Sequence, residues 1–169
     1  MKLVPAPLRS PGWFPEPRQA EELVARLASG HDAVVLDFGA RLASPAVVVL
    51  LRSCDRVFLV STPLRTALRA VSRFRGRGLA EVGGEKVVAV INRVGVRGGL
   101  SPRDAAHLLG FGEFFEVPED PAVMQAENEA LERGVYAPPA LKKKSLIRSA
   151  LLALLDRAGA WRKKEVELC

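Results

Sequence analysis

Apolar runs of strand length alternate with segments of helical periodicity along this chain, which is the pattern of repeated β-α units around a mainly parallel sheet. The runs at residues 33–36, 56–60 and 86–91 are continuously apolar, as expected for strands that are buried on both faces. Residues 114–117 predict a further short strand, and an extended segment at 2–5 opens the chain. The expected fold class is α/β, with three layers in the order α/β/α and a sheet of about five strands.

Capping residues indicate where the helices between these strands begin. Ser44 and Pro45 suit an N-cap and a first helical residue, and Ser101 and Pro102 repeat this pair later in the chain. The glycine-rich stretch 75–85 is expected to be a connection rather than a helix. Helices are predicted at residues 18–28, 45–52, 66–74, 102–109 and 121–133, and after a basic cluster within 141–161.

The length of 169 residues, with 49% hydrophobic and 6% aromatic content, suits a single domain over residues 1–169 with a core of Val, Leu and Ala. The apolar runs are far shorter than the roughly 20 residues needed to cross a bilayer, and the N-terminus has no signal-peptide pattern. The two cysteines and two histidines have no metal-ligand spacing. We therefore expect a cytoplasmic protein with no metal held by Cys or His.

Polar residues follow four of the predicted strands. In a doubly wound sheet, ligands bind at the carboxyl ends of the parallel strands. Side chains in these positions are therefore the first candidates for a binding site. The four ends are Asp37-Phe38-Gly39, Ser61-Thr62-Pro63, Asn92-Arg93 and Pro118-Glu119-Asp120.

Taken in order, these ends and their strands resemble the MinD/ParA/CpaE group of deviant Walker ATPases over roughly residues 1–160. Residues 31–37 (HDAVVLD) resemble the aspartate-tipped Walker B strand of that family, and residues 53–63 (SCDRVFLVSTP) resemble its next strand. Residues 88–94 (VAVINRV) resemble the strand whose Asn faces the adenine. The stretches 98–101 (GGLS) and 117–120 (VPED) resemble a later helix start and the strand end beside the base. The resemblance implies a P-loop NTPase-like fold.

The resemblance also implies roles for particular residues, with ATP and Mg²⁺ as cofactors. A carboxylate at a strand tip can orient a magnesium-bound water beside the phosphates, so Asp37 is the catalytic candidate on the metal side. An Asn amide both donates and accepts hydrogen bonds, which fits the edge of adenine, so Asn92 is the base candidate. Arg93, Pro118 and Asp120 are the other candidate cofactor-binding residues. The structural alternatives are that Asp37 caps the following turn and that Asn92 closes its strand.

The chain departs from this family at its phosphate site. Phosphate binding in such a fold depends on a Gly-x-x-x-x-Gly-Lys-Ser/Thr loop, whose backbone amides and lysine hold the phosphates. The glycine-rich stretches 76–78 and 95–99 lack both this spacing and the lysine. We therefore expect no autonomous ATP hydrolysis, and a chain that binds no cofactor is an open alternative. The chain is then either a part of a longer protein or a shortened, degenerate relative.

The missing loop has a consequence for assembly. In relatives, the strand that carries the loop lies in the middle of the sheet, so its absence implies a gap. The sheet must close up or pair with another chain, because unpaired strand edges bind other strands. We therefore expect a protein partner or a homo-oligomer.

Two basic surfaces accompany the net charge of +6, in an arginine-rich, amide-poor composition typical of thermophiles or of GC-rich genomes. The first surface follows a predicted helix and its exit loop. It is either a solvated helix face or a surface for nonspecific DNA binding. Its members are Arg65, Arg69, Arg73, Arg75 and Arg77.

The second basic surface flanks the last predicted helix, with Lys142–Lys144 before it and Arg162–Lys164 after it. Such a helix binds a membrane surface in some relatives. Here the apolar side chains, among them Ile147, Leu151, Leu154 and Ala158, favour packing on the sheet over membrane contact.

Three functions are consistent with the sequence. The first is a MinD/ParA/CpaE-like nucleotide switch for septum placement, chromosome or plasmid partition, or pilus positioning. The second is a non-catalytic protein-interaction module of the same fold. The third is a nonspecific DNA-binding protein.

Overall fold

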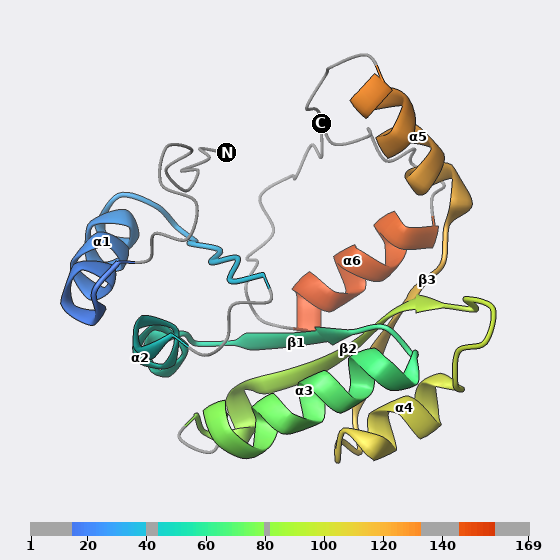
Figure 1. The fold of residues 1–169 in the computed structure, drawn as a ribbon. Helices are drawn as coiled ribbons and strands as arrows, with labels where there is room; N and C mark the ends of the chain where they lie inside the picture. The colour runs from blue at the N-terminus through green and yellow to red at the C-terminus, as the bar shows by residue number, and fades with distance from the viewer. Residues whose placement is uncertain (1–14, 40–43, 80–81, 133–145, 158–169) are drawn as a thin grey trace.

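The computed structural model describes residues 15–39, 44–79, 82–132 and 146–157 of the chain. Helices and strands alternate along these residues, as the apolar pattern predicts (Figure 1). In order, the elements are α1 (Pro17–Ser29), α2 (Pro45–Ser53), β1 (Val57–Ser61), α3 (Arg65–Gly78), the short 3₁₀ helix η1 (Gly84–Lys86), β2 (Val87–Val94), α4 (Pro102–Leu108), β3 (Phe114–Pro118), α5 (Pro121–Glu132) and α6 (Leu146–Arg157).

The described strands form one parallel sheet in the order β1-β2-β3. β1 pairs with β2 from Val57 opposite Val87 onward, and β2 pairs with β3 from Ala89 opposite Phe114. The predicted strands at 56–60, 86–91 and 114–117 are all present, with small differences at their ends. Because all three run in the same direction, their carboxyl ends meet at one edge of the sheet.

The predicted strand at residues 33–36 is wrong. These residues follow α1 as a stretched segment, but they pair with no strand in the described part of the chain (Figure 1). A strand needs a neighbour for its backbone groups, and apolar sequence alone does not supply one. The sheet therefore has three strands within the described residues instead of about five, and the segment at 2–5 lies outside them.

Helices cover both faces of the sheet. In Figure 1, α3 and α4 lie below the strands and α6 lies above them. On the lower face, the helices contact the sheet through a cluster of buried apolar side chains. That cluster consists of Leu68, Ile91, Ala105 and Leu109.

The last helix, α6, belongs to the core. Leu154 is 7% exposed and forms a buried cluster with Val90 and Val117, against which Ile147 and Ala150 also pack. The prediction that this helix packs on the sheet is therefore confirmed. Ala158 and the basic clusters at 142–144 and 162–164 lie outside the described residues. None of the helices described is long and apolar enough to cross a bilayer.

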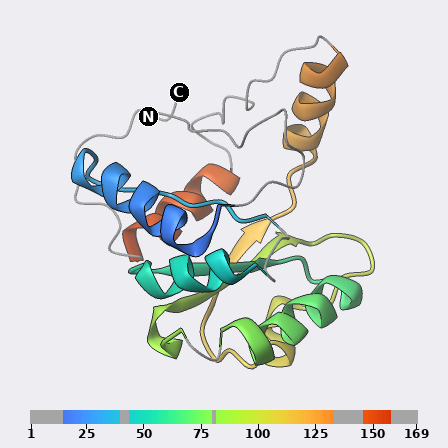
Figure 2. The same ribbon diagram turned by 60° about the vertical axis from the view of Figure 1, so that its left-hand side comes forward.

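The first two helices pack on each other and on the stretched segment between them. Ala20 of α1 and Ala46 and Leu50 of α2 form a buried cluster, with Leu36 and Phe38 packed against it. α1 and α2 lie side by side when the molecule is turned (Figure 2). Residues 33–38 are therefore held by helices rather than by a neighbouring strand.

Local signals explain most of the helix boundaries. The Ser101 hydroxyl accepts a hydrogen bond of 3.1 Å from the Asp104 backbone N–H, so the predicted N-cap of α4 is confirmed. α3 differs from the prediction, because it continues to Gly78 through what was expected to be a connection. A tertiary contact supports this last part: Arg75 Nη1 donates to the Leu109 carbonyl at 2.5 Å, and its guanidinium lies 4.8 Å from the centre of the Phe111 ring.

Candidate functional site

The carboxyl ends of β2 and β3 form one continuous structure. Asn92 lies opposite Val117 and Val94 lies opposite Pro118, with a bulge in β2 between them. The Glu119 backbone N–H then donates to the Val94 carbonyl at 2.8 Å, which extends the pairing past the end of β3. This arrangement brings together four of the residues predicted to bind a cofactor. They are Asn92, Arg93, Pro118 and Asp120.

Arg93 has an unusual backbone at the centre of this group. Its φ is +62°, and it is the one non-glycine residue with a positive φ in the described chain. This region costs an ordinary residue on the order of 1 kcal/mol, so such residues persist where the surroundings hold them. The Arg93 backbone N–H donates to Asn92 Oδ1 at 2.9 Å, which stabilises the turn.

The Arg93 side chain is held by Glu119. Arg93 Nε lies 2.7 Å from Glu119 Oε2, and Nη2 lies 2.8 Å from Oε1. The hydrogen bonds from Arg93 lower the pKa of Glu119, and the same contacts raise the pKa of Arg93. Both groups are therefore charged at neutral pH, and the pair fixes one wall of the site.

Glu119 was not among the predicted site residues. In the sequence, Glu119 is an acidic residue shortly after the predicted strand at 114–117, and Arg93 lies shortly after the predicted strand at 86–91. That signal identifies an ion pair once the register of β2 and β3 is known, and the register is not visible in the sequence.

Asn92 and Asp120 differ in which of their polar atoms already form hydrogen bonds within the described chain. Asp120 Oδ1 accepts from the Ala122 backbone N–H at 3.1 Å and so caps the start of α5. Asn92 Oδ1 accepts from Arg93, whereas the Asn92 side-chain NH₂ donates to no group in the described chain. Asn92 therefore presents a hydrogen-bond donor at the carboxyl edge of the sheet.

The loop after β1 packs against the loop after β2. Pro63 is fully buried, and its carbonyl accepts from the Leu100 backbone N–H at 2.9 Å. Gly99 lies so close that a Cβ there would be 3.0 Å from Pro63 Cγ and 3.1 Å from the Val96 carbonyl oxygen. The carboxyl ends of all three strands are thus tied to one another.

Asp37 lies on another element, near the end of the stretched segment that follows α1. Its Oδ1 accepts from the Gly39 backbone N–H at 2.9 Å, and Gly39 has a φ of +53°. This is an Asx turn, so the geometry agrees with the interpretation that Asp37 caps the following turn. No hydrogen bond or ion pair between described residues joins Asp37 to Asn92.

The chemistry of the described residues can be compared with the needs of a nucleotide. The Asn92 donor suits the edge of a purine base. The described residues include no cluster of three or more His, Cys, Asp or Glu side chains that could hold a metal ion. The 169 residues also contain no Gly-x-x-x-x-Gly-Lys-Ser/Thr loop for the phosphates, so the chain does not by itself fit a triphosphate with its magnesium.

The predicted arginine surface divides into two parts. Arg65, Arg69 and Arg73 are exposed on one side of α3, and no acidic side chain in the described residues pairs with them. Arg75 instead binds the Leu109 carbonyl and the Phe111 ring. Arg77 lies in α3, and its side chain is outside the description.

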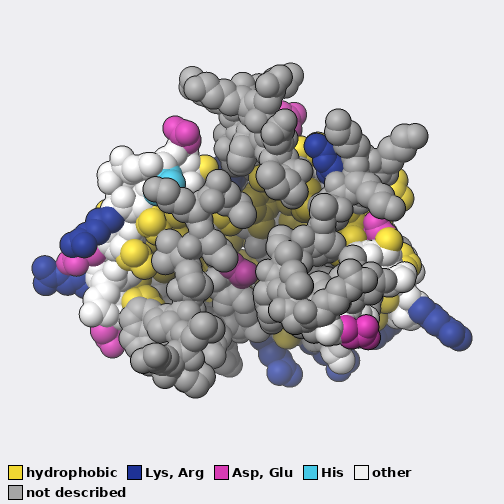
Figure 3. Space-filling model, turned by 90° about the horizontal axis from the view of Figure 1, so that it is seen from above, with side chains coloured by type: hydrophobic (Ala, Val, Ile, Leu, Met, Phe, Trp, Pro, Cys, Tyr) yellow, Lys and Arg dark blue, Asp and Glu magenta, His cyan; other side chains and the backbone are white. Residues whose placement is uncertain are grey.

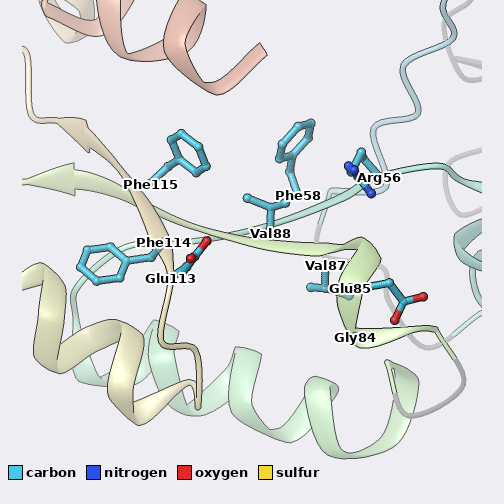
Figure 4. A pocket seen from close by; sticks show the side chains of 9 residues that line it. All are labelled: Arg56, Phe58, Gly84, Glu85, Val87, Val88, Glu113, Phe114 and Phe115. Atoms are coloured by element: carbon cyan, nitrogen blue, oxygen red, sulfur yellow. The ribbon is translucent and has the colours of Figure 1, made fainter. Parts of the chain in front are cut away.

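A hollow of about 380 Å³ opens at the opposite, amino ends of the strands (Figure 4). Phe58 and Phe115 project on the α6 side of the sheet and Phe114 on the other side, with Arg56 and Glu113 among its polar lining. It lies away from Asn92 and Arg93. This hollow is therefore not part of the candidate site.

Comparison with known proteins gives structural matches alone. No protein-family model matches the chain, and no curated protein matches it significantly. It superposes on a ParA family ATPase from Chlorobium tepidum TLS with a TM-score of 0.59 and 22% identity, covering 80% of this chain and 56% of that one.

Two further matches come from Aquifex aeolicus. The cell division protein MinD gives a TM-score of 0.65 at 18% identity, covering 88% of this chain and 63% of that chain. A MinC:MinD cell division protein complex gives 0.60 at 17% identity, covering 90% and 61%. The chain spans about three fifths of the length of the solved chains it matches. Over most of its own length, this chain has the fold of ParA and MinD ATPases, at low sequence identity.

Proposed function

We propose that the chain, as a single domain over residues 1–169, is a nucleotide-responsive positioning protein of the MinD/ParA/CpaE type without ATPase activity of its own. The cluster at the carboxyl ends of β2 and β3 is the main support for this proposal. There, the Asn92 NH₂, which donates to no group among the described residues, lies beside the ion pair of Arg93 and Glu119. A ParA family ATPase and the cell division protein MinD are among the solved proteins that share this fold.

In this proposal, Asn92 donates to the edge of adenine, with Arg93, Pro118 and Asp120 around the base. Asp37 serves the metal side of a nucleotide with Mg²⁺. Hydrolysis is not proposed, because no residue of this chain supplies the phosphate-binding amides and lysine. The expected role is to report nucleotide binding to a partner in the cytoplasm, as part of septum placement, DNA partition or pilus positioning.

A protein partner fits this role. One solved neighbour is a complex of MinC with MinD. By analogy, we propose that this chain acts through another protein or through a second copy of itself.

The test is a titration of the purified chain with a fluorescent ATP analogue and Mg²⁺, repeated with Asn92→Ala and Asp37→Ala. Arg103→Ala, an exposed change on α4, is the matched control. The proposal expects saturable binding that Asn92→Ala weakens by about tenfold, the loss of one hydrogen bond to the base. If Asp37→Ala weakens binding of the analogue only when Mg²⁺ is present, the result would support the role of Asp37 on the metal side.

A Kd of about 1 mM corresponds to a binding free energy of only about 4 kcal/mol. If no binding is detected up to about 1 mM nucleotide, this chain alone has no nucleotide site. If the chain is also shown to be folded, that result would favour the second function, a non-catalytic protein-interaction module of the same fold.

A second candidate is nonspecific DNA binding through Arg65, Arg69 and Arg73, since these cations are exposed and lie on one side of α3. The test is DNA affinity as a function of salt. Each of these arginines that contacts a phosphate contributes about 0.9 to the slope of log K against log salt, so changing all three to Gln should lower the slope by nearly three. An unchanged slope would mean that these arginines contact no DNA phosphates and that this side of α3 is a solvated helix face.

A further inference from the structure

The hollow at the amino ends of the strands is a second place in this chain where a small ligand fits. Its volume is about 380 Å³, and small-molecule sites span roughly 300–1,000 Å³. Each strand contributes a side chain to it: Phe58 from β1, Val88 from β2 and Phe115 from β3 (Figure 4). Because the strands are parallel, Asn92 lies toward the other end of the sheet. The hollow is therefore independent of the candidate nucleotide site.

On the α6 side, the floor of the hollow is apolar. Phe58, Val88 and Phe115 are half-buried there and pack against the buried cluster that includes Leu154 of α6. α6 contacts β3 more extensively than the other strands, so it leaves the β1 end of this floor more open. Seen from the α6 side, hydrophobic side chains are visible in the middle of the molecule, and most Lys and Arg side chains lie toward its edge (Figure 3). Covering this floor with an apolar group removes it from water, which is favourable.

Arg56 places a positive charge beside this apolar floor. It lies two residues before Phe58, and both side chains line the hollow (Figure 4). Arg56 is exposed, and within the described chain its guanidinium donates only to the neighbouring Asp55 carbonyl, over a long 3.4 Å. No acidic side chain in that part of the chain pairs with it. Most of the five N–H donors of an arginine are therefore available here to a ligand.

The acidic residues that line the hollow are turned away or already engaged. The Glu85 carboxylate lies over Gly83, where an added Cβ would overlap its Oε1. In Figure 4 the Glu85 side chain points away from Phe58. Glu113 takes part in an interaction of its own. Arg56 is therefore the charged lining residue that remains for a ligand on the apolar floor.

Lys86 adds positive charge at the same edge of the sheet. It directly precedes Val87, which pairs with Val57, so Lys86 lies across from Arg56 in the parallel register. Its Nζ donates to the Arg52 carbonyl at 3.3 Å, and a carbonyl does not neutralise its charge. Two cations at the amino edge of β1 and β2 attract an anion and repel a cation.

We propose that this hollow binds a small aromatic carboxylate, with its ring system on Phe58, Val88 and Phe115 and its carboxylate on Arg56. A guanidinium and a carboxylate are both planar and form two parallel hydrogen bonds, so Arg56 suits this group in particular. One available arginine balances one negative charge, which favours a carboxylate over a doubly charged phosphate ester. An aromatic body suits the two phenylalanines, because aromatic rings attract one another in stacked and edge-to-face arrangements.

The test uses naphthylacetate as the probe and naphthylethanol as its neutral analogue. Each is titrated into the isotope-labelled full chain without nucleotide, and NMR follows the backbone amide shifts. Arg56→Gln removes the charge from an exposed side chain, and Phe58→Leu keeps an apolar side chain without the ring. Arg103→Gln, at an exposed arginine on α4 outside the lining of the hollow, is the matched control. The same spectra show whether each variant is folded.

The expected result is saturable binding of naphthylacetate, with shift changes at residues 56–58, 87–88 and 113–115 and none at Asn92. Arg56→Gln should weaken naphthylacetate at least about tenfold, through loss of the charge-assisted pair, and leave naphthylethanol unchanged. Phe58→Leu should weaken both ligands, and Arg103→Gln should weaken neither.

Three results would overturn the proposal. The first is no saturable binding up to about 10 mM naphthylacetate, because a ligand of this size with ordinary efficiency binds at about 1 mM or better. The second is equal binding of naphthylacetate by the wild type and Arg56→Gln, or of the acid and the alcohol by the wild type. The third is a set of shift changes centred on another part of the chain.

Discussion

Arg93 and Glu119 are 26 positions apart in the chain and form a two-point ion pair, with contacts of 2.7 and 2.8 Å. The pair joins the last residues of β2 to the residue after β3, directly beside Asn92. Arg93 reaches this position with a left-handed backbone, at a φ of +62°. The candidate base site is therefore built on a fixed and locally strained turn, and its geometry can be tested by mutation.

The backbone at position 93 predicts an unusual order of stabilities. Arg93→Ala and Arg93→Gly both remove the ion pair, but glycine adopts a positive φ without steric cost. We expect the Gly variant to be more stable than the Ala variant by about 1 kcal/mol in chemical denaturation. In a helix or strand the order would be reversed. An Ala variant as stable as the Gly variant would contradict the left-handed turn.

The ion pair also predicts a pH dependence. The hydrogen bonds from Arg93 lower the pKa of Glu119 in the folded chain below its usual value of 4.5. The unfolded chain therefore takes up the proton at a higher pH than the folded chain does. The contribution of the pair to stability is complete above pH 4.5 and disappears as the pH falls through the folded pKa.

The measurement is the Tm of the wild-type chain and of Glu119→Gln between pH 3 and 7, with steps of about half a unit. The wild type should be the more stable at pH 7, and the difference should shrink on acidification below the usual Glu pKa. A difference that stays constant across this range would show that the Glu119 carboxylate does not contribute through its charge.

Gly110 and Gly76 predict opposite effects of the same substitution. Gly110 has a φ of +73°, and a Cβ there would overlap the Arg75 guanidinium that binds the Leu109 carbonyl. Gly110→Ala should therefore destabilise the chain by on the order of 1–3 kcal/mol. Gly76 lies in α3 with open space around it, so Gly76→Ala should stabilise by about 0.5–1 kcal/mol. Equal effects at the two positions would contradict the contact between Arg75 and Leu109.

Two leucines of α6 test whether this helix belongs to the core. Leu154 is 7% exposed and Leu146 is 70% exposed. We expect Leu154→Ala to lower the free energy of unfolding by about 2–5 kcal/mol and Leu146→Ala to change it by less than about 0.5 kcal/mol. Similar small effects at both positions would mean that α6 does not pack on the sheet in solution.

The sequence predicted the elements whose signals are local. The strands after residue 55 and the N-cap at Ser101 follow from apolar runs and capping chemistry, and both are present. The end of α3 was missed, because the contact of Arg75 with Leu109 supports residues that look like a loop. Glu119 was missed because its role depends on the register between β2 and β3.

Residues 33–36 show a different limit of sequence reasoning. Their apolar run carries the signal of a buried strand, and their burial alternates as in a strand. They still form no strand in the described chain, because pairing requires a neighbour that local sequence cannot supply. The roles of Asp37, Asn92, Arg93, Pro118 and Asp120 in nucleotide binding also stay predictions.

Residues 33–38 carry the sequence pattern of a strand but pair with no strand in the described part of the chain. Amide hydrogen exchange of the chain alone measures this lack of pairing. Unpaired backbone amides exchange quickly, whereas amides in a sheet are protected. We expect the amides of residues 34–37 to exchange within about tenfold of the unfolded rate and those within β2 to be protected by several orders of magnitude. Protection of residues 34–37 equal to that of β2 would contradict this expectation, because the segment would then already be paired within a sheet.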